Sequence, residues 1–146
     1  MKKILLAALI LGFGLRSLAA NPVNVNEKVL NAFNKTFVNV SDIIWSEAGD
    51  YYYVNFKQNE VVVRATYDKQ GNMVNSLRYY KEDQLPILIL SKVKNRFSDK
   101  SIYAITEETN ESGVHYHITL QDEKHWVMII SDSYGNISVD KKYDKA

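Results

Sequence analysis

The sequence predicts an α+β fold built from two tandem repeats, each with one helix followed by four strands, and with both helices on one face of the sheet. A helical apolar pattern occurs twice, 60 residues apart. Its members recur every four residues, as Val25, Val29, Phe33 and Phe37 and again as Leu85, Ile89, Val93 and Phe97. A short turn also occurs twice, as DKQGN at 68–72 and as DSYGN at 132–136.

The first 20 residues have the layout of a secretory signal peptide. Two lysines precede an apolar run over 4–15, and small residues follow, so cleavage is expected near Ala19 or Ala20. The apolar run is shorter than the roughly 20 residues that a membrane helix needs, although an uncleaved anchor stays open as an alternative. We therefore expect a mature domain, 21–146, that is periplasmic or extracellular and does not bind the membrane.

Composition narrows the possible partners of this domain. Cleavage would remove Lys2, Lys3 and Arg16, which leaves 18 − 3 = 15 basic residues against 17 acidic ones, a net charge of −2. A near-neutral chain without a basic run is not expected to bind nucleic acid. The chain has no cysteine, so disulfides and a lipid-modified cysteine are excluded, and a packed core must supply its stability.

Each repeat begins with its helix, and the second helix has clear start signals. Asp83 can cap it, and Pro86 suits a first turn, where a missing N–H costs little. These patterns predict repeat 1 over 24–80 and repeat 2 over 83–143.

Strand patterns follow both helices in the same order. Tyr52, Val54 and Phe56 alternate with their neighbours, as do residues 116, 118 and 120, and the segment 60–67 corresponds to 124–131. First strands are expected near 43–48 and 102–107, and last strands near 73–80 and 137–142. The spacing grows from 60 to 64 residues, which predicts four extra residues in the loop 108–113.

The repeated turn is interpreted as a hairpin. Asp68 and Asp132 can accept hydrogen bonds from backbone N–H groups of the turn, and the glycines supply positive φ. A calcium loop would need further oxygen ligands at alternate positions, which neither copy has.

Three histidines are the candidates for a metal or small-ligand sensing site. His115 and His117 lie two apart in a strand and share one face, and His125 begins the next strand. The competing interpretation is a solvent-side pair, because Tyr116 and Ile118 occupy the alternate positions. No cysteine nucleophile and no G-x-S-x-G turn are present, so catalysis is not expected, and no cofactor is predicted.

The sheet face opposite the helices is the main candidate for binding. If Tyr52 and its alternates point towards the helices, the residues between them point away. The expected partner-binding residues are Tyr51, Tyr53, Arg64, His117, Trp126 and Met128. Such a face has the composition of an interaction surface, although a bulge could reverse the strand parity, and a dimer or a loop could cover the face.

Several segments resemble those of the secreted PepSY-like proteins, which are also described as β-lactamase-inhibitor-like. The segments are YYYVNF, YDKQGN, SLRYY and LPILILSKVKNRF, although the second repeat has Ser131 where the first has Tyr67. The resemblance implies one curved antiparallel sheet made of both repeats and no known catalytic residue. The leading hypothesis is a non-catalytic periplasmic or secreted module that binds an unidentified envelope or secreted protein through the sheet face opposite the helices, with inhibition of a peptidase or other envelope enzyme as one outcome. An accessory protein without a persistent ligand is the remaining alternative, and the oligomeric state is left open.

Overall fold

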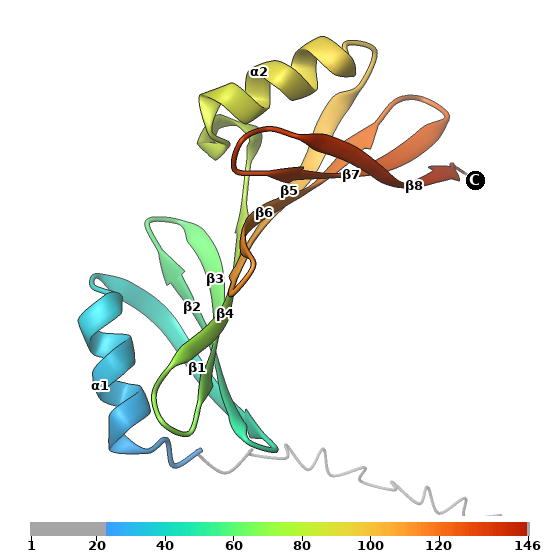
Figure 1. Ribbon diagram of the computed structural model, residues 1–146. Helices are drawn as coiled ribbons and strands as arrows, with labels where there is room; N and C mark the ends of the chain where they lie inside the picture. The colour runs from blue at the N-terminus through green and yellow to red at the C-terminus, as the bar shows by residue number, and fades with distance from the viewer. Residues whose placement is uncertain (1–22, 146) are drawn as a thin grey trace, which may run out of the picture.

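The computed structural model describes residues 23–145, and Figure 1 shows their arrangement. The predicted signal peptide lies outside the described residues. The elements follow the predicted order, and their bounds are α1 Glu27–Thr36, β1 Val40–Ala48, β2 Tyr51–Gln58, β3 Val61–Asp68, β4 Met73–Tyr80, α2 Ile87–Arg96, β5 Ser101–Asn110, β6 Gly113–Gln121, β7 His125–Asp132 and β8 Ile137–Asp144. A single 3-10 turn, η1 Glu82–Gln84, precedes α2. Within the described residues, neither helix is long and apolar enough to cross a membrane.

The strands form one antiparallel sheet in sequence order, β1 to β8, which confirms the predicted fold class. Paired residues on neighbouring strands point to the same face, and Val63, Arg78, Glu107 and Tyr116 form one such row across β3, β4, β5 and β6. The faces covered by α1 and by α2 are therefore the same face of one sheet. In Figure 1 the sheet bends where β4 and β5 pair, and both helices lie on the outer side of that bend.

Each helix buries one stripe on its own half of the sheet. In the first half, Phe33 of α1 packs against Trp45 of β1 and Phe56 of β2, with ring centroids 5.3 and 5.2 Å away. In the second half, Ile89 and Val93 of α2 belong to the buried core together with the inward residues of β5, β6 and β7. The four-residue apolar spacing predicted both stripes correctly.

The repeated turn joins strands and also seats a helix. Asp68 Oδ1 accepts hydrogen bonds from the N–H groups of residues 70 and 72, and its Oδ2 accepts one from the Asn72 side chain. Asp132 makes the same three contacts within its own turn. The hydrogen bonds from Asn72 and Asn136 are the main reason that the pKa of each aspartate lies below its usual range. The hairpin interpretation is confirmed, and the aspartate oxygens are already engaged.

Both turns reach the helix of their own repeat. Asn26, the N-cap of α1, accepts a hydrogen bond from Val29 N–H and donates one to the Lys69 carbonyl in the first turn. In the second half, Lys92 of α2 donates to the Tyr134 carbonyl over 2.8 Å. Each copy of the turn therefore also helps to hold the helix of its own half on the sheet.

The four extra residues of repeat 2 lie at the predicted place, but they do not form a loop. In repeat 1, Ala48 pairs with Tyr51 and a two-residue turn follows directly. In repeat 2, the corresponding pair is Glu108 and His115, and two more residue pairs follow before the turn. These two residue pairs extend β5, so that residues 109 and 110 also pair with residues 76 and 75 of β4. The insertion therefore lengthens the strand pair that joins the two halves.

Polar contacts on the helix-bearing face reinforce that junction. Tyr80 of β4 donates a hydrogen bond to Glu107 of β5 over 2.8 Å, and Arg78 pairs with the other carboxylate oxygen at 3.1 Å. Burial, assisted by the Glu107 contact, raises the pKa of Tyr80 well above its usual value. A buried tyrosine and a paired carboxylate thus add side-chain contacts to the pairing of β4 with β5.

Tyr67 provides a test of core polarity. Its ring is buried, its hydroxyl has no hydrogen-bond partner among the described residues, and burial raises its pKa to about 12. Because an unpaired buried hydroxyl costs about 1–3 kcal/mol, Tyr67→Phe is expected to raise the free energy of unfolding by about 1 kcal/mol in urea titrations. Tyr51→Phe, which alters an exposed hydroxyl, is the control. A clear loss of stability in Tyr67→Phe would show that the hydroxyl is hydrogen-bonded in solution.

Candidate interaction face

All six predicted binding residues lie on the sheet face opposite the helices. On β2, Tyr51 and Tyr53 alternate with buried Tyr52 and Val54. The same alternation places the others on this face, from β3, β6 and β7, as Arg64, His117, Trp126 and Met128. The strand parity expected from the sequence is therefore correct at these positions, while their role in binding stays a prediction. We call this surface the open face.

The predicted residues form two groups at opposite ends of the open face. Tyr51, Tyr53 and Arg64 belong to the first half, where the Arg64 Nε donates to the Asn55 side chain over 2.9 Å. His117, Trp126 and Met128 belong to the second half. The structure therefore does not gather the six residues into one pocket.

A row of side chains between the two groups connects them. In register across β3, β4, β5 and β6 lie Val62, Tyr79, Thr106 and His117. Val62 and Tyr79 are exposed although both are largely apolar. Tyr79 was missed in the sequence because the face assigned to β4 depends on how that strand pairs with β3 across a bulge.

Tyr103 of β5 is a second residue that the sequence reasoning missed. A bulge between Ile102 and Ala104 inserts it into the strand, and its ring is 64% exposed. Its ring stands edge-on to Trp126, with centroids 4.7 Å apart and an interplanar angle of 74°. The available signal was the three-residue spacing of Ile102 and Ile105, which breaks strict alternation and indicates a bulge.

Glu108 organises the polar centre of the open face. Its carboxylate accepts hydrogen bonds from Asn75 over 2.8 Å and from Asn110 over 3.2 Å, and it lies 3.1 Å from the His117 ring. Partial burial alone would raise the pKa of Glu108, but the contacts with His117, Asn75 and Asn110 outweigh it and lower the pKa. This carboxylate therefore stays ionised and holds His117 in place.

The structure separates the three histidines of the metal hypothesis. His115 and His117 lie on the open face, whereas His125 shares the parity of buried Val127 and lies on the face that carries the helices. No group of three or more potential metal-ligating side chains occurs among residues 23–145. A site that uses all three histidines is therefore wrong.

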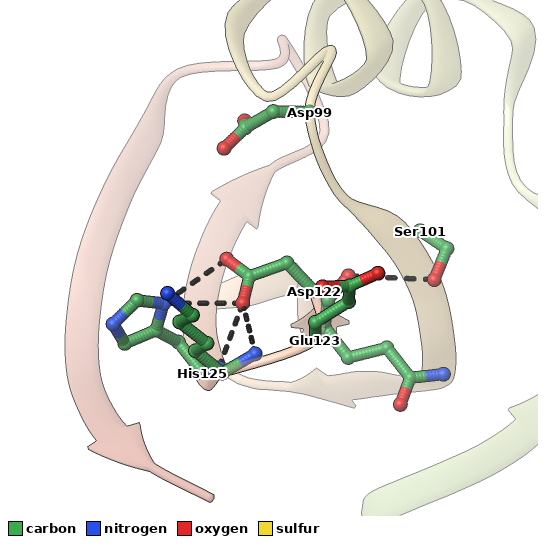
Figure 2. Close-up of a pocket in the computed structure, with 7 residues that line it drawn as sticks. Asp99, Ser101, Asp122, Glu123 and His125 are labelled. Carbon is green, nitrogen blue, oxygen red and sulfur yellow. Dashed lines mark hydrogen bonds and ion pairs between the residues drawn. The ribbon is translucent and has the colours of Figure 1, made fainter.

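A hollow of about 700 Å³ lies beside His125 (Figure 2), lined by Asp99, Ser101, Gln121, Asp122, Glu123, Lys124 and His125. Asp122 accepts hydrogen bonds from the N–H groups of residues 124 and 125, and its carboxylate lies 3.1 Å from the His125 ring. The hydrogen bond from the Lys100 side chain is the main reason that the pKa of Asp122 lies far below its usual value. The oxygens of Asp122 are thus used to shape the β6–β7 turn.

Comparisons with known proteins support the fold. No protein-family model and no curated protein matches the sequence. Among solved structures, a BLIP-like protein of Bacteroides fragilis matches with a TM-score of 0.65 at 16% identity, over 84% of this chain and 87% of that chain. A DUF2874 family protein of Bacteroides ovatus matches with a TM-score of 0.65 at 15% identity, over 84% of this chain and 89% of that chain.

A candidate periplasmic protein of Bacteroides eggerthii matches with a TM-score of 0.63 at 17% identity, over 84% of this chain and 90% of that chain. These similarities cover nearly the whole length of each of the three solved structures. They therefore concern the whole eight-stranded architecture rather than one repeat. The chain therefore has the fold of the BLIP-like and DUF2874 proteins of Bacteroides, as its resemblance to β-lactamase-inhibitor-like proteins implies.

Proposed function

We propose that this protein is a non-catalytic periplasmic module that binds another envelope or secreted protein through the open face. The observation that carries the proposal is the chain of exposed apolar and aromatic side chains on a sheet face that neither helix covers. Its members are Ile44, Tyr51, Val62, Tyr79, Tyr103, Met128 and Tyr143.

The chemistry of this face favours a protein partner. Tyr, Trp, Met and Arg are the residues that protein interfaces favour, and contiguous apolar surface edged by polar groups is typical of interaction sites. Arg64 and Glu108 add fixed polar contacts that could orient a partner. The backbone hydrogen bonds of the sheet fix the positions from which these side chains project, so little backbone entropy would be lost on binding.

Independent features support the proposed location. The signal peptide predicted over 1–20 favours export, and one structural neighbour is a candidate periplasmic protein. In Figure 1 the open face lies on the inner side of the sheet bend, away from both helices. Inhibition of a peptidase or another envelope enzyme is the specific activity that we propose for this surface.

Affinity capture from a periplasmic extract tests the proposal. The mature chain is expected to retain a defined protein, and the double variant Tyr53→Ala/Trp126→Ala is expected to lose it, because an aromatic anchor of an interface typically contributes 2 kcal/mol or more, about thirtyfold in affinity. Tyr134→Ala is the matched control, because Tyr134 is exposed in the β7–β8 turn, away from the open face.

Circular dichroism and thermal melting separate loss of binding from loss of fold. Both variants should keep the wild-type spectrum and melting temperature, since Tyr53 and Trp126 lie outside the buried core. Equal capture by the double variant and the control would refute the open face as the binding surface. Unfolding of the double variant would show instead that these residues support the fold.

A further inference from the structure

The side chain of Lys145, just after β8, lies on the open face over Trp126. Its ammonium nitrogen is 4.4 Å from the centroid of the indole ring. The same nitrogen donates a hydrogen bond to the Gln121 side-chain oxygen over 3.1 Å. The Lys145 backbone N–H donates to the Lys124 carbonyl over 2.7 Å, which holds the segment beside the β6–β7 turn. The ammonium group therefore has a defined seat.

The residues around this seat come from four adjacent strands. Trp126 of β7 pairs with Gln121 of β6 on one side and with Tyr143 of β8 on the other. Tyr103 of β5 reaches Trp126 because the bulge inserts its side chain there. Tyr103 is 64% exposed and Tyr143 is 50% exposed, so the site is open to a partner. We call Trp126, Gln121, Tyr103 and Tyr143 the ammonium seat.

This seat suits one compact cation. An indole face attracts a cation more strongly than any other aromatic side chain, and the Gln121 amide oxygen can accept one N–H bond of the ammonium. Among the described residues, no carboxylate lies within 4.0 Å of the Lys145 ammonium. The contact consists of one aromatic face and one amide without an opposite charge, so another ammonium group can replace that of Lys145.

We propose that the ammonium seat binds a lysine side chain of the partner, and that Lys145 occupies it in the free protein as an internal competitor. The inference rests on the proposed function, because the seat is part of the open face. It adds the chemistry of one contact: the partner presents a lysine, and that lysine must displace Lys145. Removing Lys145 should therefore strengthen binding of an external lysine.

Nuclear magnetic resonance of the full domain tests this with a defined probe. The probe is the capped tripeptide acetyl-Gly-Lys-Gly-amide, and the glutamine analogue is the uncharged control. The indole N–H signal of Trp126 reports on the seat, and that of Trp45, which packs on Phe33 in the other half, reports on the integrity of the fold. The probe's affinity does not depend on whether any natural partner is captured.

In the Lys145→Ala variant, the lysine peptide should shift the Trp126 signal saturably, at a concentration severalfold lower than in the wild-type chain. The glutamine peptide should produce no saturable shift, and Trp45 should not move. A Lys145→Ala/Gln121→Ala variant should bind the lysine peptide more weakly than Lys145→Ala alone. Absence of a saturable shift in Lys145→Ala, or an equal response to the glutamine peptide, would overturn the inference.

These outcomes are distinct from those of the capture experiment. If the peptide fails to bind while the partner is still captured in a Trp126-dependent way, the open face functions without a lysine contact. If the peptide binds and nothing is captured, the seat exists and the proposed function fails.

Discussion

Replacement of Phe33 by alanine is expected to lower the free energy of unfolding by about 3–5 kcal/mol. Phe33 is 2% exposed, and its ring contacts three other aromatic rings, those of Phe37, Trp45 and Phe56. The other buried residue of α1 is Val29, which is smaller, so Phe33 supplies a large share of the apolar burial that holds this helix on the sheet. The loss would combine removed apolar burial with a cavity that stiff aromatic neighbours cannot fill.

Urea denaturation followed by tryptophan fluorescence is the appropriate measurement, because Trp45 lies in the affected half and Trp126 in the other. Leu88→Ala is the matched control: Leu88 lies on α2 and is 52% exposed, so its truncation should change stability by less than about 0.5 kcal/mol. A loss of less than about 1 kcal/mol in Phe33→Ala would mean that α1 does not depend on this aromatic cluster.

Gly71→Ala should destabilise the protein by about 1–3 kcal/mol, through the repeated turn rather than the core. Gly71 has a φ of +91°, and a Cβ there would lie 2.9 Å from the Lys28 carbonyl oxygen and 3.1 Å from its carbon. These are backbone atoms in the first turn of α1, and the Asn26 cap holds that turn in place. The helix would have to shift to make room, which would break its contact with the turn.

Two further glycines are matched controls for this effect. Gly49 also has a positive φ, +59°, but nothing lies within 4 Å of a Cβ there, so Gly49→Ala isolates the cost of the backbone conformation. At Gly135 the Cβ would meet the Lys92 side chain, which can move aside. Thermal melting should therefore rank Gly71→Ala as the most damaging of the three. Equal losses at Gly71 and Gly49 would show that the turn does not seat α1.

The sequence was a good predictor of the architecture because the repeat made each pattern testable against a second copy. The apolar helix stripes, the strand alternation and the Asp-x-x-Gly-Asn turn each occur twice in the same order, and all were found where expected. The extra residues of repeat 2 were located by the same alignment. Their conformation was not predictable. Whether the extra residues lengthen the loop or extend the two strands depends on the pairing of β5 with β4.

The candidate site was predicted in part, and the misses share a cause. Alternation placed Tyr53 and Trp126 on the open face correctly, since a regular strand has a period of two. Tyr103 lies beside a bulge in β5, and Tyr79 lies on β4, whose pairing with β3 is also irregular. A local pattern loses its phase at such a point. The histidine hypothesis failed for a different reason: the regular alternation of β7 puts His125 on the helix-bearing face with Val127, whereas His115 and His117 lie on the open face.

By itself, the sequence determined the two-repeat plan, the residues that each helix buries and the turn that joins the last two strands of each repeat. These are local properties, set by side-chain spacing and by the hydrogen bonds that an aspartate and a glycine can make within a few residues. Only the tertiary structure decided that the halves join through β4 and β5, that the repeated turns seat the helices, and that Lys145 lies on Trp126. Each of these contacts joins residues that are distant in sequence or displaced by a bulge. Such contacts produce no periodic pattern in the sequence, so the sequence does not predict them.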